Sequence, residues 1–225
     1  MDKVNRLEVK DVKYAYEDGG KTNQVLNGVN AEFVSGKLYC IIGESGSGKT
    51  TLISLISALD NLQEGDILFN DKSIKKIGNS AFRLKYVNIV FQSYNLLTYM
   101  TGRENVEVAV DYAGVKYDKD KIYQILERVG IDKEKADRPV LKLSGGEQQR
   151  VAIARCIATD DPIIVADEPT GNLDEETEEK IITIFKELAK GGKIVILVSH
   201  SKKVAEHADV VYLIRKGVIH ISDKK

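Results

Sequence analysis

The sequence has no tryptophan, only two cysteines and three prolines, and no long apolar run. A helix that crosses a bilayer needs roughly 20 consecutive apolar residues, whereas the longest apolar runs here, "IIVA" and "IVILV", have the length of a strand. The opening segment "MDKVNRLEVKD" also lacks the apolar stretch of a secretory signal peptide. We therefore expect a cytoplasmic chain that contacts a membrane only through a partner.

The charges show almost no excess of either sign, because 33 Lys and Arg face 34 Asp and Glu, a formal net charge of -1. A nucleic-acid-binding domain usually carries a basic excess that neutralises phosphates, so we expect no nucleic-acid partner.

Cys40 and Cys156 lie far apart in apolar runs and match no metal-ligand spacing. This pattern favours buried thiols in a reducing compartment over a redox role.

What the sequence does contain is enough apolar material for a core, at 43 % of 225 residues. Its first part alternates between apolar and polar residues from Leu7 to Tyr16, turns at "EDGGK" and continues as an extended run from Val25 to Phe33. Alternation on both sides of a turn predicts an antiparallel, partly exposed β-subdomain at the N-terminus.

Three continuous apolar strands follow, "LYCIIG" (38–43), "IIVAD" (163–167) and "KIVILVSH" (193–200). Such runs are typical of parallel strands buried on both faces. The segment between the last two has an apolar stripe at helical spacing and ends at Gly191–Gly192, as an amphipathic helix does. A strand, a helix and a strand in this order predict an α/β fold with a mainly parallel core sheet.

Residues 93–157 have helical spacing instead, and the first of their helices begins with a Thr101/Glu104 capping-box pattern. We interpret them as a helical lobe inserted into the sheet. The chain 1–225 is then a single domain, with a core lobe of residues 1–92 and 158–225 and a helical lobe of residues 93–157.

The segment "GESGSGKT" (43–50) fits the phosphate-loop pattern G-x-x-x-x-G-K-[ST] at every fixed position, between a buried strand and a predicted helix over 49–59. Glycines let the backbone bend so that successive N–H groups point at phosphate oxygens. Lys49 would reach the β- and γ-phosphates, and the Thr50 hydroxyl would bind Mg²⁺. The candidate nucleotide-binding residues of this loop are Gly43, Glu44, Ser45, Gly46, Ser47, Gly48, Lys49, Thr50 and Thr51.

Two carboxylates end the strand "IIVADE", and a histidine ends the strand "KIVILVSH". Adjacent strand residues point to opposite sides, so we assign Asp167 to the metal and Glu168 to positioning or deprotonating the attacking water. The alternative is that both are solvated charges. His200 would lie on the same sheet edge and orient the water, although a lone histidine is more often structural.

The segment "LSGGEQQR" (143–150) resembles the signature of ABC ATPases. Ser144 and the N–H groups of Gly145 and Gly146, with Glu147 beside them, would form a second phosphate site at a helix N-terminus. The resemblance implies a head-to-tail homodimer through the ATP sites, in which the signature of one subunit closes over the phosphate loop of the other.

Other segments resemble the remaining motifs of that family, over about residues 6 to 220. The resemblance implies that Tyr16 stacks on adenine, and that Gln92 forms a lobe hinge and contacts Mg²⁺ and the attacking water. It also implies that Asp174 in "GNLD" crosses the dimer interface and that His200 is the switch histidine. The expected activity is hydrolysis of ATP with Mg²⁺, catalysed by Lys49, Gln92, Glu168 and His200.

The segments "DEPTGNLD", "FQSYNLL" and "NVEVAVDYAG" resemble one subgroup of the family, which includes macrolide and toxin exporters, lipoprotein-release, peptide-resistance and cell-division ATPases. This resemblance implies a transmembrane permease partner at the inner face of the cell membrane, driven to export or other mechanical work. A cell-division-type regulator without transport is the alternative. A DNA-repair ATPase is disfavoured, because the chain has no room for a long coiled coil.

The permease partner should dock in the cleft between the two lobes. The segment "FQSYNLLTYM" supplies five apolar or aromatic candidates for that surface. They would receive a short cytoplasmic helix of the partner, unless they merely pack the helical lobe. These residues are Tyr94, Leu96, Leu97, Tyr99 and Met100.

Overall fold

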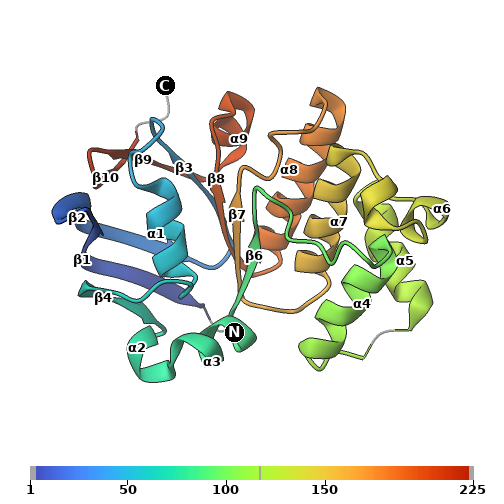
Figure 1. Cartoon of the computed structure of the whole chain (residues 1–225), viewed down its shortest axis with the longest axis horizontal. Coiled ribbons are helices and arrows are strands. Elements are labelled where there is room, and N and C mark those ends of the chain that lie inside the picture. The colour runs from blue at the N-terminus through green and yellow to red at the C-terminus, as the bar shows by residue number, and fades with distance from the viewer. Residues whose placement is uncertain (1–3, 117, 223–225) are drawn as a thin grey trace.

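The computed structural model describes residues 4–116 and 118–222 (Figure 1). Its first sheet is antiparallel, as the alternating pattern at the N-terminus predicts, and its strands are ordered β2-β1-β4-β5. The register of the long β1–β2 hairpin shifts between Val9 and Val12, where Asp11 has a left-handed φ of 46°. The strands are β1 (Arg6–Asp18), β2 (Lys21–Val34), β4 (Glu64–Phe69) and β5 (Lys72–Ser73).

The second sheet is mainly parallel, also as predicted, with the order β10-β9-β3-β8-β7-β6. Strand β10 is antiparallel to β9, and the pairs among β9, β3, β8, β7 and β6 are parallel. The strands are β3 (Lys37–Ile42), β6 (Val87–Val90), β7 (Ile163–Asp167), β8 (Ile194–Val198), β9 (Val210–Arg215) and β10 (Val218–Ile221).

Helices pack on both faces of this sheet, and α4 to α7 form a group to one side of it (Figure 1). The chain enters that group after β6 and returns from it into β7, the neighbouring strand. In the part of the chain that the structure describes, no helix has the length and apolarity needed to cross a membrane. The helices are α1 (Lys49–Ile56), α2 (Ile74–Ile77), α3 (Asn79–Lys85), α4 (Gly102–Tyr112), α5 (Lys119–Arg128), α6 (Lys133–Ala136), the 3₁₀ helix η1 (Val140–Lys142), α7 (Gly145–Ile157), α8 (Glu175–Lys190) and α9 (Lys202–His207).

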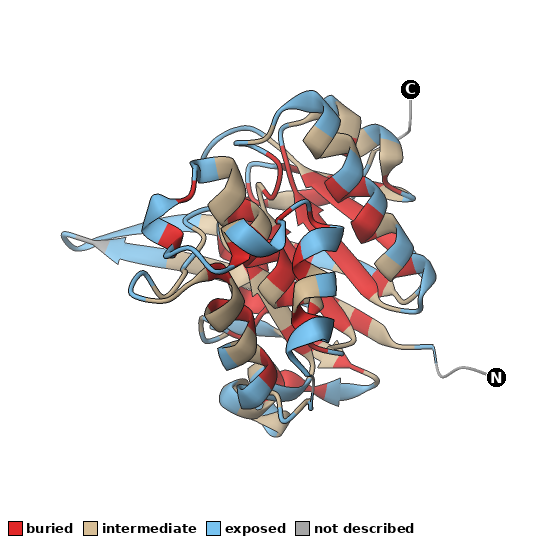
Figure 2. Ribbon diagram, turned by 90° about the vertical axis from the view of Figure 1, so that its right-hand side faces the viewer, coloured by how far each residue is buried: buried red, intermediate tan, exposed pale blue. Residues whose placement is uncertain are grey.

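The core consists of two hydrophobic clusters, and buried residues fill the centre of the molecule (Figure 2). One cluster joins α1 to the antiparallel sheet. The other joins sheet residues such as Leu38 and Val90 to Val106 and Val110 of α4. The group of helices therefore shares a core with one face of the parallel sheet.

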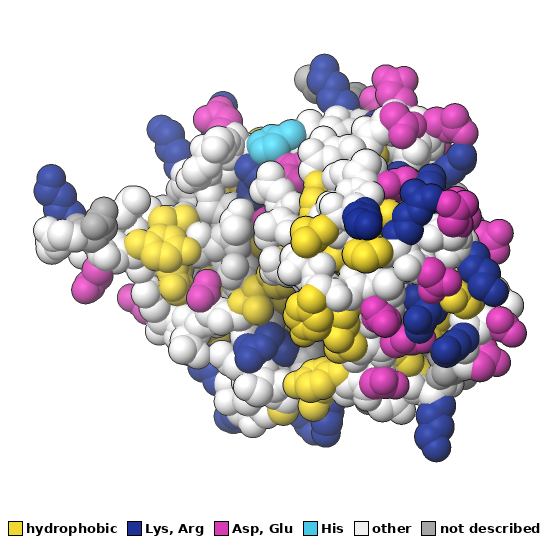
Figure 3. Space-filling view, turned by 45° about the vertical axis from the view of Figure 1, so that its right-hand side comes forward, with side chains coloured by type: hydrophobic (Ala, Val, Ile, Leu, Met, Phe, Trp, Pro, Cys, Tyr) yellow, Lys and Arg dark blue, Asp and Glu magenta, His cyan; other side chains and the backbone are white. Residues whose placement is uncertain are grey.

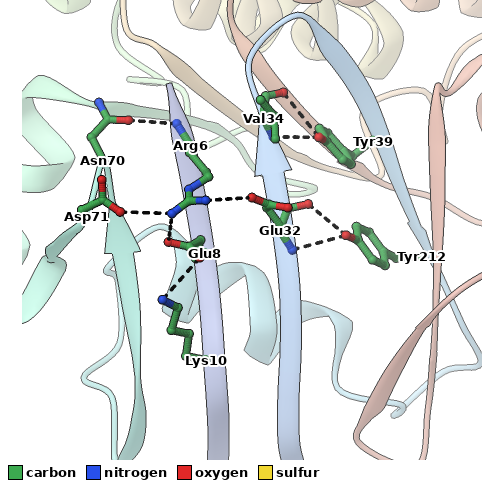
Figure 4. Close-up of polar contacts among 9 residues, drawn as sticks. All are labelled: Arg6, Glu8, Lys10, Glu32, Val34, Tyr39, Asn70, Asp71 and Tyr212. Atoms are coloured by element: carbon green, nitrogen blue, oxygen red, sulfur yellow. Dashed lines mark hydrogen bonds and ion pairs between the residues drawn. The ribbon is translucent and has the colours of Figure 1, made fainter. Parts of the chain in front are cut away.

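Two buried tyrosines fasten the antiparallel sheet to the parallel one (Figure 4). The Tyr39 hydroxyl of β3 accepts a hydrogen bond from the Val34 N–H at 2.7 Å, and the Tyr212 hydroxyl of β9 donates to the Glu32 carbonyl at 2.9 Å. Burial raises the pKa of Tyr39 to about 12, so its hydroxyl stays protonated. These two hydrogen bonds hold the hairpin that carries Tyr16 in place relative to β3, the strand that leads into the phosphate loop.

Helix α1 is shorter than its sequence predicts, because it ends at Ile56 and not at Leu59. Ala58 has a left-handed φ of 53°. The N–H groups of Ala58 and Leu59 donate to the carbonyls of Leu55 and Ser54 at 3.0 and 2.9 Å. This is the Schellman arrangement that ends many helices, and its usual glycine signal is absent here.

Candidate functional site

The segment 43–48 turns tightly between β3 and α1, and two of its glycines are required by their surroundings. A Cβ on Gly43 would lie 2.5 Å from the Ile214 carbonyl oxygen. Gly48 has a φ of 105°, and a Cβ there would lie 2.8 Å from Leu26. Any larger residue at either position would push the loop off the sheet.

The positive charge of the loop comes from Lys49 and from the start of α1. Gly48 supplies no side-chain cap, so the first N–H groups of α1 stay available to an anion. The Lys49 side chain is nearly buried, and its Nζ donates to the Gly43 and Glu44 carbonyls at 2.8 and 2.9 Å. The ammonium group is thereby held on the loop itself, beside those N–H groups.

Four neighbouring parallel strands end on the edge of the sheet that bears this loop, as the argument from strand order predicts. β3 leads into the loop, β8 into His200, β7 into Glu168, and β6 into Gln92. A cleft of about 620 Å³ opens there, of a size that suits a small-molecule ligand. Its lining residues are Tyr16, Asn23, Val25, Ser45, Gly46, Gly48, Lys49, Thr50, Thr51, Gln92, Asp167, Glu168, Gly171, Asn172 and His200.

Asp167 and Thr50 lie together in this cleft. Burial, followed by the charge of Glu168, raises the pKa of Asp167, while Lys49 and a hydrogen bond with Thr50 oppose the shift. A buried carboxylate beside a second carboxylate favours a bound cation. Among the described residues, no group of three or more acidic, His or Cys side chains is arranged so that it could hold a metal ion. One carboxylate and one hydroxyl nevertheless suit Mg²⁺, which completes its shell with phosphates and water.

Glu168 faces the same cleft as Asp167, so strand alternation does not separate the two carboxylates. The strand ends at Asp167, and Glu168 has a left-handed φ of 47°, which turns its side chain. Its Oε2 accepts from the His200 N–H at 3.3 Å, and its Oε1 lies 3.5 Å from His200 Nε2. Oε1 is buried and has no hydrogen-bond partner among the described residues, so its capacity to accept a hydrogen bond is unused within them.

Four residues line the cleft without having been predicted from the sequence: Asn23, Val25, Gly171 and Asn172. Asn23 and Val25 lie on β2, the second strand of the hairpin. The register pairs Tyr16 with Asn23, so both reach the cleft. The Tyr16 ring is 45 % exposed, and its hydroxyl lies 3.3 Å from the Thr51 hydroxyl. The turn at "EDGGK", taken with the antiparallel register, was the signal that could have located Asn23.

Several expected site residues do not line the cleft. Gly43, Glu44 and Ser47 lie in the loop without lining the cleft, and the Ser47 Oγ is buried without a hydrogen-bond partner among the described residues. Asp174 caps α8 and accepts from the Thr177 N–H and hydroxyl at 3.0 and 2.7 Å. These contacts hold its carboxylate at the start of that helix.

The signature residues also lie outside the cleft, at the start of α7. The Ser144 hydroxyl accepts from the Glu147 N–H at 3.3 Å, and Glu147 accepts from the Ser144 N–H at 2.9 Å. This capping box uses the first and the fourth N–H group and leaves those of Gly145 and Gly146 for another acceptor. The Glu147 carboxylate is held in the cap and by Lys135 at 3.0 Å.

A glycine-rich loop at a helix N-terminus, a buried lysine and two carboxylates at the end of β7 define a phosphate-loop nucleotide site. Comparison with known proteins agrees with this class. The family model for "ABC transporter" matches residues 26–171. An ABC transporter ATP-binding protein of Bacillus subtilis (strain 168), YclH, is 43 % identical, and the match covers 98 % of each chain.

Solved structures give the same result. A dimeric ABC transporter cassette, MJ0796, has 31 % identity and a TM-score of 0.89, over 95 % of this chain and 96 % of that one. Its post-hydrolysis dimer with ADP and phosphate has 30 % identity and a TM-score of 0.90, over 97 % and 99 %. The macrolide export ATP-binding/permease protein MacB of Pasteurella multocida is 34 % identical over 95 % of this chain but only 33 % of its own length.

The chain therefore belongs to the ABC transporter family, as an ATP-binding subunit that hydrolyses ATP. The fold and the recognition of the family from residues 143–150 are confirmed. The roles of the individual site residues rest on the geometry described above.

Proposed function

We propose that this subunit hydrolyses ATP with Mg²⁺ in a head-to-tail homodimer and drives export by a separate transmembrane partner. The observation that carries the proposal is the convergence of Lys49, Asp167, Glu168 and His200 in one cleft. Tyr16 and Asn23 border the same cleft, where an adenine ring would stack. Antimicrobial peptides, lipoproteins and drugs are the proposed classes of cargo, and MacB, a macrolide exporter by name, supports the last.

Each residue has a distinct task in this scheme. The loop N–H groups and Lys49 bind the phosphates and stabilise charge that develops on the γ-phosphoryl group. Thr50, Asp167 and Gln92 would hold Mg²⁺, which would neutralise the charge of the phosphates. The Glu168 carboxylate takes a proton from the attacking water, and His200 orients Glu168 and the γ-phosphate.

The homodimer completes the site with the signature of the other subunit. Within one chain, Ser144, Gly145 and Gly146 lie outside the cleft, while the N–H groups of the two glycines remain available to an acceptor. The dimeric cassettes among the similar structures support this arrangement. Asp174, at the start of α8, would contact the other subunit.

Mixing two inactive variants tests the shared site. Ser144→Arg and Lys49→Ala should each be inactive alone. In their heterodimer, one site carries both defects and the other carries neither, so we expect partial recovery of ATPase activity. The measurement is phosphate release after mixing, with the heterodimer verified by differently tagged subunits. If verified heterodimers stay inactive, the two elements do not serve one ATP.

The partner would dock in a groove of about 310 Å³ between the sheet and α4, where Figure 3 shows hydrophobic side chains gathered on one face. Of the five residues predicted for this surface, only Tyr99 is largely exposed, at 78 %, while Tyr94 and Leu96 pack against the core. The groove is lined instead by Leu59, Arg83, Leu84, Val87, Asn88, Ile89, Phe91, Ala109, Tyr112, Ala113, Arg155, Thr159 and Asp161.

An amphipathic helix from the partner fits this groove, because its apolar wall is contributed by both α3 and α4. Leu84 is 41 % exposed and Tyr112 is 77 % exposed. The flanking Arg83, Arg155 and Asp161 offer polar contacts to the ends of such a helix. A helix seated there would transmit movement of the α4–α7 group to the membrane partner, and this would place the subunit at the inner face of the cell membrane.

Charged substitutions in the groove should separate docking from hydrolysis. Leu84→Glu and Tyr112→Glu should leave the ATPase activity of the isolated subunit within about twofold, because surface changes rarely alter a fold. They should abolish co-sedimentation with membranes that contain the partner. Ile221→Glu is the control, since Ile221 is 70 % exposed on β10, at the other end of the molecule. Sedimentation of all three variants like the parent would contradict this docking site.

A further inference from the structure

Tyr94 lies two residues after Gln92 and connects three segments that the sequence keeps far apart. Its hydroxyl accepts a hydrogen bond from Asn172 Nδ2 at 2.9 Å. Asn172 lines the ATP cleft and lies in the loop that follows Glu168. The Tyr94 ring is partly buried against the core cluster that includes α4 and α7.

The backbone at Tyr94 is held by the signature helix. Tyr94 and Asn95 have left-handed φ angles of 62° and 48°, a sparsely populated conformation for residues other than glycine. Arg155 of α7 donates to both of their carbonyl oxygens, at 2.9 Å to Tyr94 and 2.6 Å to Asn95. The turn after Gln92 therefore keeps its shape through a residue three turns along the signature helix.

The first residues of the signature helix also lie close to Tyr94 and Asn172. A Cβ on Gly145 would lie 3.3 Å from the Tyr94 hydroxyl, and one on Gly146 would lie 3.2 Å from the Asn172 carbonyl oxygen. Asn172 is thus bounded by Tyr94 on one side and by the signature on the other. The Gly171 N–H also donates to the Glu168 carbonyl at 3.3 Å, which ties this loop to Glu168.

From these contacts we infer that Tyr94 is a positioning residue for hydrolysis. Its hydroxyl holds Asn172, and Asn172 in turn holds the loop beside Glu168 in a fixed position relative to the signature helix. Tyr94 does not line the cleft, so it acts on the chemical step and not on ATP binding. This inference rests on the proposed role of Glu168 as the group that activates water. The proposed connection between the loop and the signature helix depends on the Tyr94 hydroxyl group, which a single substitution removes.

The test is a double-mutant cycle of Tyr94→Phe and Asn172→Ala, measured as kcat and KM for ATP. Tyr94→Phe keeps the ring and removes one hydrogen bond, so we expect kcat to fall about twofold to fivefold with KM unchanged. The double variant should be no slower than Asn172→Ala alone, because both changes break one contact. Tyr99→Phe is the matched control, as Tyr99 lies in the same segment with a 78 % exposed side chain, and should show parent kinetics.

Three outcomes would overturn the inference. They are an unchanged kcat in Tyr94→Phe, a rise in KM that accounts for the whole effect, and additive losses in the double variant. Thermal unfolding of each variant checks that the fold is intact. Parent-like hydrolysis by Glu168→Gln would instead contradict the proposed function, so the two failures are distinguishable.

Discussion

Lys49→Ala abolishes turnover and weakens ATP binding, if the cleft works as its geometry indicates. The ammonium group supplies the one lysine charge that lines the cleft in the described structure. Loss of one such electrostatic stabiliser typically costs about 10²–10³ in kcat, and here ground-state binding suffers too. We expect a loss of at least about 10²-fold, measured as phosphate release at saturating ATP, with binding followed by calorimetry.

A control for Lys49→Ala must show whether the substitution disturbs the fold of the loop. Lys49 also donates to the Gly43 and Glu44 carbonyls, so its removal costs two contacts within the loop. Circular dichroism and thermal unfolding would show whether the variant keeps its fold. Lys190→Ala, which changes an exposed lysine in the last turn of α8, should behave like the parent. A folded Lys49→Ala protein with parent activity would exclude this loop as the phosphate site.

Glu168→Gln should separate nucleotide binding from hydrolysis. Glutamine has almost the same shape and keeps an oxygen to accept from the His200 N–H, but it cannot take a proton from water. Loss of a general base typically costs about 10²–10⁴ in rate. ATP should therefore still bind and close the dimer, and the closed dimer should persist because it cannot hydrolyse its ATP.

Gel filtration with light scattering, with and without ATP and Mg²⁺, measures this effect. Glu175→Gln changes an exposed carboxylate at the start of α8 and is the matched control, which should return to monomer as its ATP is consumed. A Glu168→Gln protein that stays monomeric at high concentration and saturating ATP would argue against dimer closure by ATP alone. One that hydrolyses ATP normally would remove Glu168 from the mechanism.

Much of this site could be predicted from the sequence, because its parts are contiguous motifs whose local shape follows from residue type. The loop 43–50 encodes its turn in its glycines, and the buried strands place Asp167 and His200 on one edge. Alternation along a strand failed at Glu168, because the backbone turns left-handed there with no glycine to indicate it. The end of α1 at Ile56 was missed for the same reason, since Ala58 occupies the left-handed position.

The other features of the site and its surroundings depend on contacts between segments that are distant in the sequence, and no local pattern predicts such contacts. Asn23 reaches the cleft only through the hairpin register. The groove proposed for docking lies between segments that are distant in the sequence, α3 and α4, so no local pattern such as the apolar segment 94–100 could indicate it. The contact of Tyr94 with Asn172 spans 78 positions and exists only in the folded chain.

The way in which the helices α4–α7 join the sheet has a consequence for how such subunits diversify. The chain leaves the sheet after Val90 and returns at Ile163, and these two ends belong to adjacent paired strands. Because β6 and β7 are parallel, the two junctions lie at opposite ends of the strand pair, offset by about three residues or roughly 10 Å along the strands. A segment bounded in this way can be exchanged, lengthened or recombined as a cassette while the catalytic strands keep their pairing. Changes confined to α4 would alter one wall of the proposed docking groove for a new membrane protein. Gln92 and the signature residues 143–150 lie in the same segment, so a chimera spliced at these two points would have to keep them.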